Sequence, residues 1–242
     1  LRLSETSLGS KVVVIGLGVI GQLVCRLAEA QGSDVIGIDP EPERSKYGDN
    51  FFTSADDIEL KDIDSVIITA ATSSNEPIEL ATKIARNKAK IVVVGDIPLN
   101  ISRNDFYYKE LELVVSKSYG PGRYDKQYEA LGNDYPIEYV RWTENRNFEA
   151  FTKLLSQKQI HLLDLVSEEI AFEDAPSVYE KFDDEIKPLS VVLRYNIDSE
   201  PKIEMENDLQ PEPKTSKVTV GILGAGNFAA TTMMPVLKEL KR

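Results

Sequence analysis

The sequence predicts an α/β fold in which a doubly wound parallel sheet carries helices on both faces. Short, β-branched apolar runs such as KVVVI at Lys11–Ile15 are typical of central strands buried on both sides. These runs alternate with helical stretches of ten or more residues, and strand–helix–strand units connect parallel strands by right-handed crossovers. We expect the strand order 3-2-1-4-5-6 for this sheet.

The first half of the chain supplies the elements of the sheet in order. After the first strand, apolar residues recur with the spacing of one helix face, and Gly32 is placed to end that helix. The recurring residues are Ile20, Leu23, Val24, Leu27 and Ala28. The next predicted elements are strands at Asp34–Ile38, Ser65–Thr69, Lys90–Val94 and Leu111–Ser116, with a helix from about Asn75 to Arg86.

The pattern is looser after Tyr119. The elements expected there are a helix through Phe148, Phe151, Leu154 and Leu155, strands at Val166–Phe172 and Leu189–Arg194, and a short helix at Ala175–Phe182. Ser199–Ser216 contains three prolines and several carboxylates without periodicity, which is typical of an exposed linker. A strand at Val218–Leu223 and a helix that runs to Arg242 are expected after it.

Composition excludes several classes of protein. The chain has 242 residues and a formal net charge of −12, which argues against nucleic acid or an anionic membrane as a partner. One cysteine and one histidine are too few for a Cys/His zinc site, and the single cysteine fits a reducing cytosol. No apolar run is long enough to span a bilayer, and no signal peptide is evident. We expect a soluble, cytoplasmic protein, and the start at Leu1 without Met suggests a fragment.

A GxGxxG motif lies between the first predicted strand and the first predicted helix. Gly16 permits the tight turn, Gly18 lets a pyrophosphate approach the backbone, and Gly21 lets the helix pack on the sheet. The helix N-terminus, which includes the amides of Val19 and Ile20, favours an anion. Such glycine turns are common, but here strand, motif and helix occur in register, which predicts a Rossmann dinucleotide site.

Asp39 predicts NAD(H) rather than NADP(H) as the cofactor. It ends the second strand and follows Gly16 by 23 residues, near the expected separation of about 20. Its carboxylate is placed to accept hydrogen bonds from the adenosine ribose, whereas the 2′-phosphate of NADP would be repelled. Arg44 and Lys46 would soften that repulsion if they turned inward, but we expect solvated helix charges.

Two loops at the carboxyl ends of strands are expected to complete the site, because ligands of open α/β sheets bind there. These loops carry Ala70 and Ala71 after the fourth strand, and Gly95 and Ile97 after the fifth. Small residues at these positions leave room for ribose and nicotinamide. The alternative is that they serve only as turn residues.

Other residues are expected to be structural. His161 is expected to be a satisfied histidine and Cys25 a small buried hydrophobe. Trp142 and Tyr139 are expected to pack between the sheet and the segment after it. For Tyr119 and Arg123, which flank a glycine turn, a ligand contact and a structural turn both remain open.

Four segments follow one another in the chain: KVVVIGLGVIGQLVCRLAEAQGSDVIGIDPEPER, SVIITAATSS, KIVVVGDIP and KELELVVSKSYGPGRYD. Their order resembles the cofactor half of a medium-chain dehydrogenase of the zinc alcohol dehydrogenase type, over roughly Leu8 to Asp198. In that family a later segment returns to complete the catalytic domain, and Leu154–Phe182 resembles it.

A second motif, GxGxxA, follows the linker with Gly224, Gly226 and Ala229. It resembles the opening of the glucose–fructose oxidoreductase and inositol dehydrogenase family. Two dinucleotide motifs 208 residues apart are similar to bi-domain oxidoreductases, which implies a link to surface polysaccharide synthesis. The second unit stops after one predicted strand and helix, so its apolar residues are expected to be poorly ordered, to pack on a neighbour or to mediate association.

The resemblance implies four regions: an NAD-binding domain at 1–135, a returning segment of the catalytic domain at 136–198, a linker at 199–216 and a truncated second Rossmann unit at 217–242. We expect an NAD-dependent oxidoreductase that transfers hydride to or from an alcohol or sugar carbonyl. No residue for proton transfer and no metal ligand is identified, so we expect the fragment to be inactive alone and to meet its small-molecule substrate through a missing domain. A homo-oligomer is left open. The alternatives are a non-catalytic NAD(H) sensor and an interaction module with a vestigial site.

Overall fold

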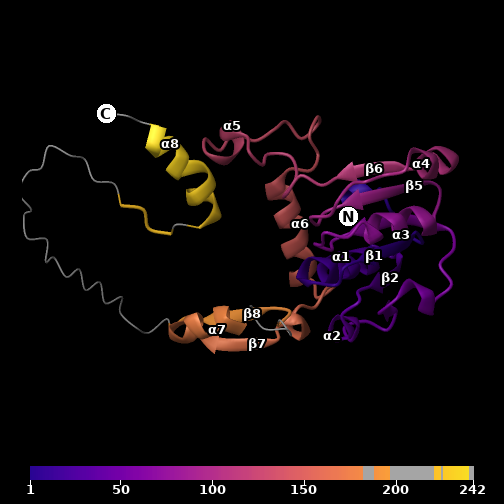
Figure 1. Cartoon of the computed structure of the whole chain (residues 1–242), viewed down its shortest axis with the longest axis horizontal. Coiled ribbons are helices and arrows are strands. Elements are labelled where there is room, and N and C mark those ends of the chain that lie inside the picture. The colour runs from indigo at the N-terminus through magenta and orange to yellow at the C-terminus, as the bar shows by residue number, and fades with distance from the viewer. Residues whose placement is uncertain (182–187, 197–220, 225, 240–242) are drawn as a thin grey trace, which may run out of the picture. The chain divides into compact units, whose positions relative to one another are not determined.

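The computed structural model describes residues 1–181, 188–196, 221–224 and 226–239, and the chain divides into two compact units, Leu1–Asn196 and Ile197–Arg242. The first unit contains a six-stranded sheet in the order β3-β2-β1-β4-β5-β6 (Figure 1). Every neighbouring pair of strands is parallel. This sheet confirms the predicted fold class and the predicted strand order.

The elements of the sheet agree closely with the predicted ones. The strands are β1 (Lys11–Ile15), β2 (Asp34–Ile38), β3 (Phe51–Phe52), β4 (Ile63–Ile68), β5 (Ala85–Val93) and β6 (Glu112–Val115). The helices between them are α1 (Val19–Ala30), α2 (Pro42–Ser45), α3 (Glu76–Ile84) and α4 (Arg103–Lys109). The sequence pattern did not locate β3, because a strand of two residues contains no apolar run from which to predict it.

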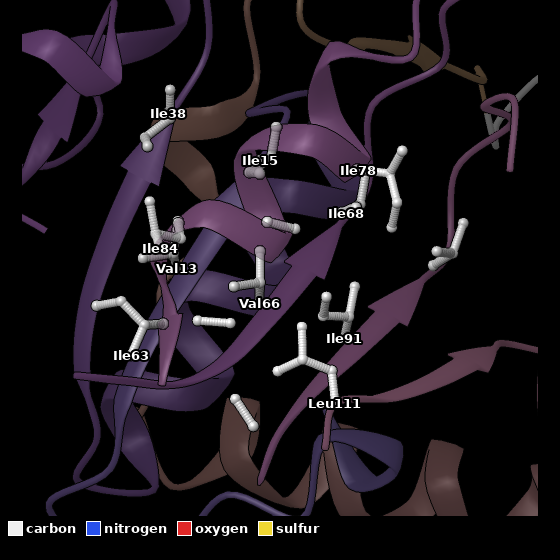
Figure 2. Packing of buried hydrophobic residues seen from close by; sticks show 14 of the residues in the cluster. Val13, Ile15, Ile38, Ile63, Val66, Ile68, Ile78, Ile84, Ile91 and Leu111 are labelled. Carbon is white, nitrogen blue, oxygen red and sulfur yellow. The ribbon is translucent and has the colours of Figure 1, made fainter. Parts of the chain in front are cut away.

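Side chains of each central strand alternate between two hydrophobic clusters, one on each face of the sheet. In β1, Val13 and Ile15 join the cluster that packs against α3, whereas Val12 and Val14 join the cluster that packs against α1. Figure 2 shows the first cluster, in which buried residues from β1, β2, β4, β5 and α3 meet. Both faces are therefore buried, which is why β1 has almost no polar residue.

The helix α1 contacts the sheet through its most tightly packed residue, Gly21. A β-carbon at Gly21 would overlap the carbonyl oxygen of Gly16, so the helix lies directly against the turn. Val24, Cys25 and Ala28 share this face and are buried. Ile20 points away and is 57% exposed, so its predicted place in the apolar stripe is wrong.

Cys25 is buried against the sheet, as predicted. Its thiol is fully inaccessible, and burial raises the pKa of that thiol well above its ordinary value. A neutral, inaccessible thiol is a poor nucleophile. Cys25 therefore contributes packing and not chemistry.

Lys109 fixes the junction between α3 and β5. Its Nζ donates hydrogen bonds to the carbonyl oxygens of Thr82, Lys83 and Ala85 at 2.7, 2.9 and 2.8 Å. These carbonyls belong to the last turn of α3 and the first residue of β5, where β5 begins earlier than the sequence pattern indicates. A cation at the carboxyl end of a helix also complements its dipole.

We therefore expect Lys109→Met to destabilise the domain by about 1–3 kcal/mol, because three carbonyls, two of them in partly buried hydrogen bonds, lose their donor. Urea unfolding followed by circular dichroism measures the change. Lys83→Met is the control. Lys83 is exposed at the same end of the helix, and its replacement removes the same charge. Equal losses for the two variants would show that charge, rather than the three hydrogen bonds, carries the effect.

The rest of the first unit contains the helices and strands that were predicted between Tyr119 and Arg194, together with α5 (Lys126–Glu129), which the sequence pattern did not predict. Its other elements are α6 (Glu144–Ser156), β7 (Glu168–Ala171), α7 (Ala175–Lys181) and β8 (Val191–Arg194). β7 and β8 form a separate two-stranded parallel sheet. Arg26 of α1 makes a two-pronged ion pair with Asp164, which holds the pKa of that carboxyl below its usual range. The carbonyl of the exposed His161 also accepts a hydrogen bond from Arg26, whereas the His161 ring has no structural role that we can identify.

Aromatic packing differs from the expectation in one residue. The Trp142 ring is half-buried and lies between two guanidinium groups, 3.1 Å from that of Arg2 and 3.9 Å from that of Arg141. Tyr139 is 88% exposed, so its predicted role as a packing residue is wrong. The reason is that its segment, between Pro136 and Arg141, forms a surface turn.

The second unit contains a π-helical turn, η5 (Ala229–Met233), followed by α8 (Met234–Glu239). The predicted strand at Val218–Leu223 falls partly outside the described residues, and its described end, 221–223, is not a strand. The linker Ser199–Ser216 lies entirely outside them. Phe228 and Val236 are 69% and 55% exposed, and the residues described at 221–224 and 226–239 include no strand that covers them. None of the helices in the described ranges is long and apolar enough to cross a membrane.

Candidate functional site

The glycine turn after β1 is held by backbone contacts that only glycine permits. Gly16 has a φ of 94°, and a β-carbon there would lie 2.5 Å from the backbone nitrogen of Ala70. Its amide donates to the carbonyl of Ile38 at 2.8 Å. At Gly21, a side chain would overlap the carbonyl oxygen of Gly16. Two of the three motif glycines are thus required by the fold.

Gly18 is different, because nothing in the protein crowds it. Its φ of −63° is open to any residue, and a β-carbon there would meet only Nη1 of Arg44, at 3.6 Å. Gly18 is the N-cap of α1, and no side chain caps this helix end. The first amides of α1, including those of Val19 and Ile20, lack the partner that a capping side chain would give them. The open approach and uncapped amides fit the pyrophosphate of a dinucleotide.

Asp39 lies at the carboxyl end of β2, against the glycine turn. Its carboxylate is 5% exposed and accepts two backbone hydrogen bonds, from Leu17 at 2.7 Å and from Glu41 at 2.9 Å. One oxygen therefore fixes the turn and the other fixes the chain that follows β2. Since each oxygen can accept more than one hydrogen bond, ribose hydroxyls remain compatible with this arrangement.

Arg44 turns inward, in contrast to the solvated position that we expected for it. Its Nη1 lies 3.7 Å from Oδ2 of Asp39 and beside Gly18. Lys46 behaves as expected, because it is exposed and pairs with Glu43. The site therefore holds one buried carboxylate and one half-exposed guanidinium at the place where the adenosine ribose and pyrophosphate would meet.

Gln22 is a residue of the site that the sequence analysis did not single out. It is fully buried, and its Nε2 donates to the carbonyls of Leu17 at 3.3 Å and Arg44 at 3.0 Å. It thus joins the glycine turn to α2. Its signal in the sequence is weak: a polar residue within the apolar face of the first helix.

The loop after β4 is hydrogen-bonded to the glycine turn, and the loop after β5 is hydrogen-bonded to the end of β4. Thr69 donates to the carbonyl of Gly16 at 2.5 Å, and the amide of Gly95 donates to Ile68 at 3.1 Å. A β-carbon at Gly95 would overlap the carbonyl of Ala70, so backbone packing requires this glycine. Ala71 is exposed at the loop surface, whereas Ile97 is 9% exposed and packs in the core. The two loops lie near the glycine turn, as expected. Gly95 is required by backbone packing and Ile97 by the hydrophobic core.

The second motif has no such surroundings within the described residues. Gly224 has a φ of 76°, yet no atom lies within 4 Å of a β-carbon placed at Gly224 or Gly226. Ala229 is buried in its own helix turn. The features that give the first motif its shape, a preceding strand and a tightly packed helix, are not seen at 221–224 and 226–239.

Comparison with known proteins agrees with this geometry. Residues 2–104 match the model of the NAD binding domain of D-isomer specific 2-hydroxyacid dehydrogenases. The chain is 26% identical over 155 residues to 2-dehydro-3-deoxy-L-galactonate 5-dehydrogenase of Pseudoalteromonas atlantica, a match that covers 58% of this chain and 42% of that protein. The chain thus spans less than half the length of this relative.

Two solved structures have the same fold. Alcohol dehydrogenase TADH from Thermus sp. ATN1 superposes with a TM-score of 0.60 and 20% identity, over 81% of this chain and 54% of that one. L-idonate 5-dehydrogenase from Escherichia coli superposes with a TM-score of 0.60 and 18% identity, over 79% and 52%. Residues 2–104 therefore match an NAD binding domain and lie in a unit with a Rossmann-type sheet.

Proposed function

We propose that this chain holds NAD(H) for an oxidoreductase and presents its nicotinamide to an alcohol or ketone of a sugar-type substrate. The observation that carries this proposal is the open approach at Gly18 beside the buried carboxylate of Asp39. The pyrophosphate would lie on the uncapped amides of α1, and the ribose hydroxyls would donate to Asp39. NAD(H), when bound, accepts or supplies the hydride.

The substrate class is supported by two of the similar proteins. One is named for 2-dehydro-3-deoxy-L-galactonate and the other for L-idonate, both of which are polyhydroxylated carboxylic acids. We propose a substrate of this chemistry for this protein. No group of three or more His, Cys, Asp or Glu side chains in the described part of the chain is arranged to hold a metal ion. We propose that the residues for proton transfer come from a further part of the protein.

The segment at 136–198 supports the proposal that a further part of the protein supplies the residues for proton transfer. A parallel pair of strands such as β7 and β8 is marginal by itself, because parallel sheets are normally larger and covered on both faces. Val192 of β8 and Tyr195, which follows β8, are 43% and 61% exposed. We propose that this pair joins a sheet of the catalytic domain, as the regions 1–135 and 136–198 imply.

We also propose the bi-domain arrangement, in which 199–216 links to a second Rossmann unit that begins at 217. Its support is the second glycine motif and its distance from the first. A cytoplasmic location is part of the same proposal, supported by the one buried, unpaired cysteine and the acidic composition.

A thermal-shift titration with NADH and NADPH tests the function. A ligand at 100 times its dissociation constant adds about 2.7 kcal/mol of stability, which corresponds to a shift of several degrees for a domain of this size. We expect this shift with NADH and a much smaller one with NADPH. Absence of a shift with NADH up to millimolar concentration would contradict the proposal.

A further inference from the structure

The carboxyl end of β6 carries a compact group of cations and tyrosines. We name Lys117, Tyr119, Arg123 and Tyr124 the cation–tyrosine cluster. The amide of Ser116 donates to the carbonyl of Val93 at 2.8 Å, so β6 ends level with β5. The cluster therefore begins at the same edge of the sheet as the loop that carries Gly95, where ligands of α/β sheets bind.

Two glycines fold the cluster onto itself. Gly120 and Gly122 have φ values of 98° and 108°, which side-chain-bearing residues rarely adopt. The resulting turn brings the guanidinium of Arg123 to 5.3 Å from the Tyr119 ring and 4.5 Å from the Tyr124 ring. The ammonium of Lys117 lies 5.5 Å from the Tyr124 ring on the way into the turn. Cations and rings thus alternate along one short stretch of surface.

Neighbouring side chains hold the turn of the cluster by an ion pair, ring contacts and a hydrogen bond. Arg123 forms an ion pair with Glu129 at 2.5 Å, and a β-carbon at Gly122 would lie 2.7 Å from the Tyr128 ring. Tyr128 stacks on Tyr135 at 5.3 Å between ring centroids. Its hydroxyl also bonds at 2.9 Å to Thr143, which is fully buried. These contacts therefore hold the turn and the Arg123 guanidinium, and the Tyr119 ring also packs at a tilt against Phe148, 5.8 Å between ring centroids.

The upper side of the cluster faces solvent. Tyr119 and Tyr124 are 53% and 68% exposed, although fixed aromatic rings usually bury most of their surface. Lys117 is exposed and makes no ion pair in the described ranges, in a chain whose net charge is −12. The hydrogen bond from Tyr135 and, to a smaller extent, the Lys117 charge lower the pKa of the nearby Asp125 carboxyl. Exposed rings beside an exposed ammonium suit a polyhydroxylated anion, because the rings contact its C–H faces, the tyrosine hydroxyls bond to its hydroxyls and the ammonium pairs with its charge.

We propose that the cation–tyrosine cluster is a subsite for the polyhydroxylated chain and anionic group of the substrate. Lys117 takes the carboxylate or phosphate, Tyr119 and Tyr124 pack against the carbon chain, and Arg123, already neutralised by Glu129, keeps the rings in place. This inference rests on the proposed function, since it names the substrate side of the same site.

Amide NMR of this chain saturated with NADH tests the subsite, with L-idonate, galactitol 1-phosphate and the neutral galactitol as probes. We expect shifts at 117–124 with an anionic probe and at least fivefold weaker binding of galactitol. Stronger binding of idonate identifies a carboxylate as the anion, and stronger binding of the phosphate identifies a phosphoryl group. Lys117→Gln is expected to weaken the preferred anion about tenfold, as for one charge-assisted hydrogen bond.

Lys126→Gln is the matched control, because Lys126 is an exposed lysine on the neighbouring α5. It should leave the affinity for every probe unchanged. Equal effects of the two variants, or no shift at 117–124 with any probe at 50 mM (roughly ten times the weakest dissociation constant expected for a single charge-assisted contact), would overturn the subsite. If NADH itself fails to bind, the proposed function fails instead, so the two failures are distinguishable.

Discussion

Gly18→Ala is expected to weaken NADH binding roughly 10- to 100-fold, as for an overpacked contact, while the protein keeps its stability. In the folded chain a β-carbon at Gly18 meets only Nη1 of Arg44, at 3.6 Å, and the backbone has a φ of −63° that alanine adopts freely. The added methyl group would instead occupy the space that the pyrophosphate needs to reach the uncapped amides of α1. Isothermal titration with NADH and urea unfolding measure the two quantities.

Gly21→Ala is the matched comparison, three residues along the same helix. Its methyl group would overlap the carbonyl oxygen of Gly16, so helix and turn would have to separate. We expect a loss of about 3 kcal/mol or more in the free energy of unfolding, because neither backbone can yield cheaply. If Gly18→Ala were as destabilising as Gly21→Ala, or bound NADH as tightly as the unmodified chain, the different roles assigned to the two glycines would be wrong.

These two glycines also show what the sequence could reveal and what it could not. The motif spacing, the β-branched run before it and the apolar helix after it are local patterns, and local patterns predicted the sheet order. The division of roles is not local. It depends on how closely α1 lies to Gly16, and that distance also turned Ile20 outward although its spacing suited the buried face.

Contacts between distant residues escaped prediction for the same reason. Gln22 joins Leu17 to Arg44, and Lys109 holds the end of α3 across a separation of more than 20 residues. In the sequence, Gln22 is marked only by being a polar residue on an apolar helix face, and nothing near Lys109 marks it. Ile97 shows the reverse case, since its loop is at the predicted edge of the sheet but its side chain packs in the core.

Asp39→Asn is expected to shift the ratio of NADH to NADPH affinity toward NADPH by about one to three orders of magnitude. The carboxylate and the 2′-phosphate would be like charges near 4 Å apart, a repulsion of roughly 4 kcal/mol at the effective dielectric of a protein surface, and asparagine removes it. The inward guanidinium of Arg44, 3.7 Å from Asp39, would then be free to pair with the phosphate. The double variant Asp39→Asn with Arg44→Gln should lose much of the gain.

Asparagine is preferable to alanine here because Asp39 also supports the turn. Alanine would leave the amides of Leu17 and Glu41 without their acceptors, whereas asparagine keeps an acceptor for one of the two through its Oδ1. Any loss of fold would weaken the binding of both cofactors alike. The ratio of the two affinities, measured by titration on one variant, cancels any such common loss. If the ratio of NADH to NADPH affinity were unchanged in Asp39→Asn, the Asp39 carboxylate would only fix the turn and would not select the cofactor. The selection would then have to rest on Arg44 and the loops around Gly18.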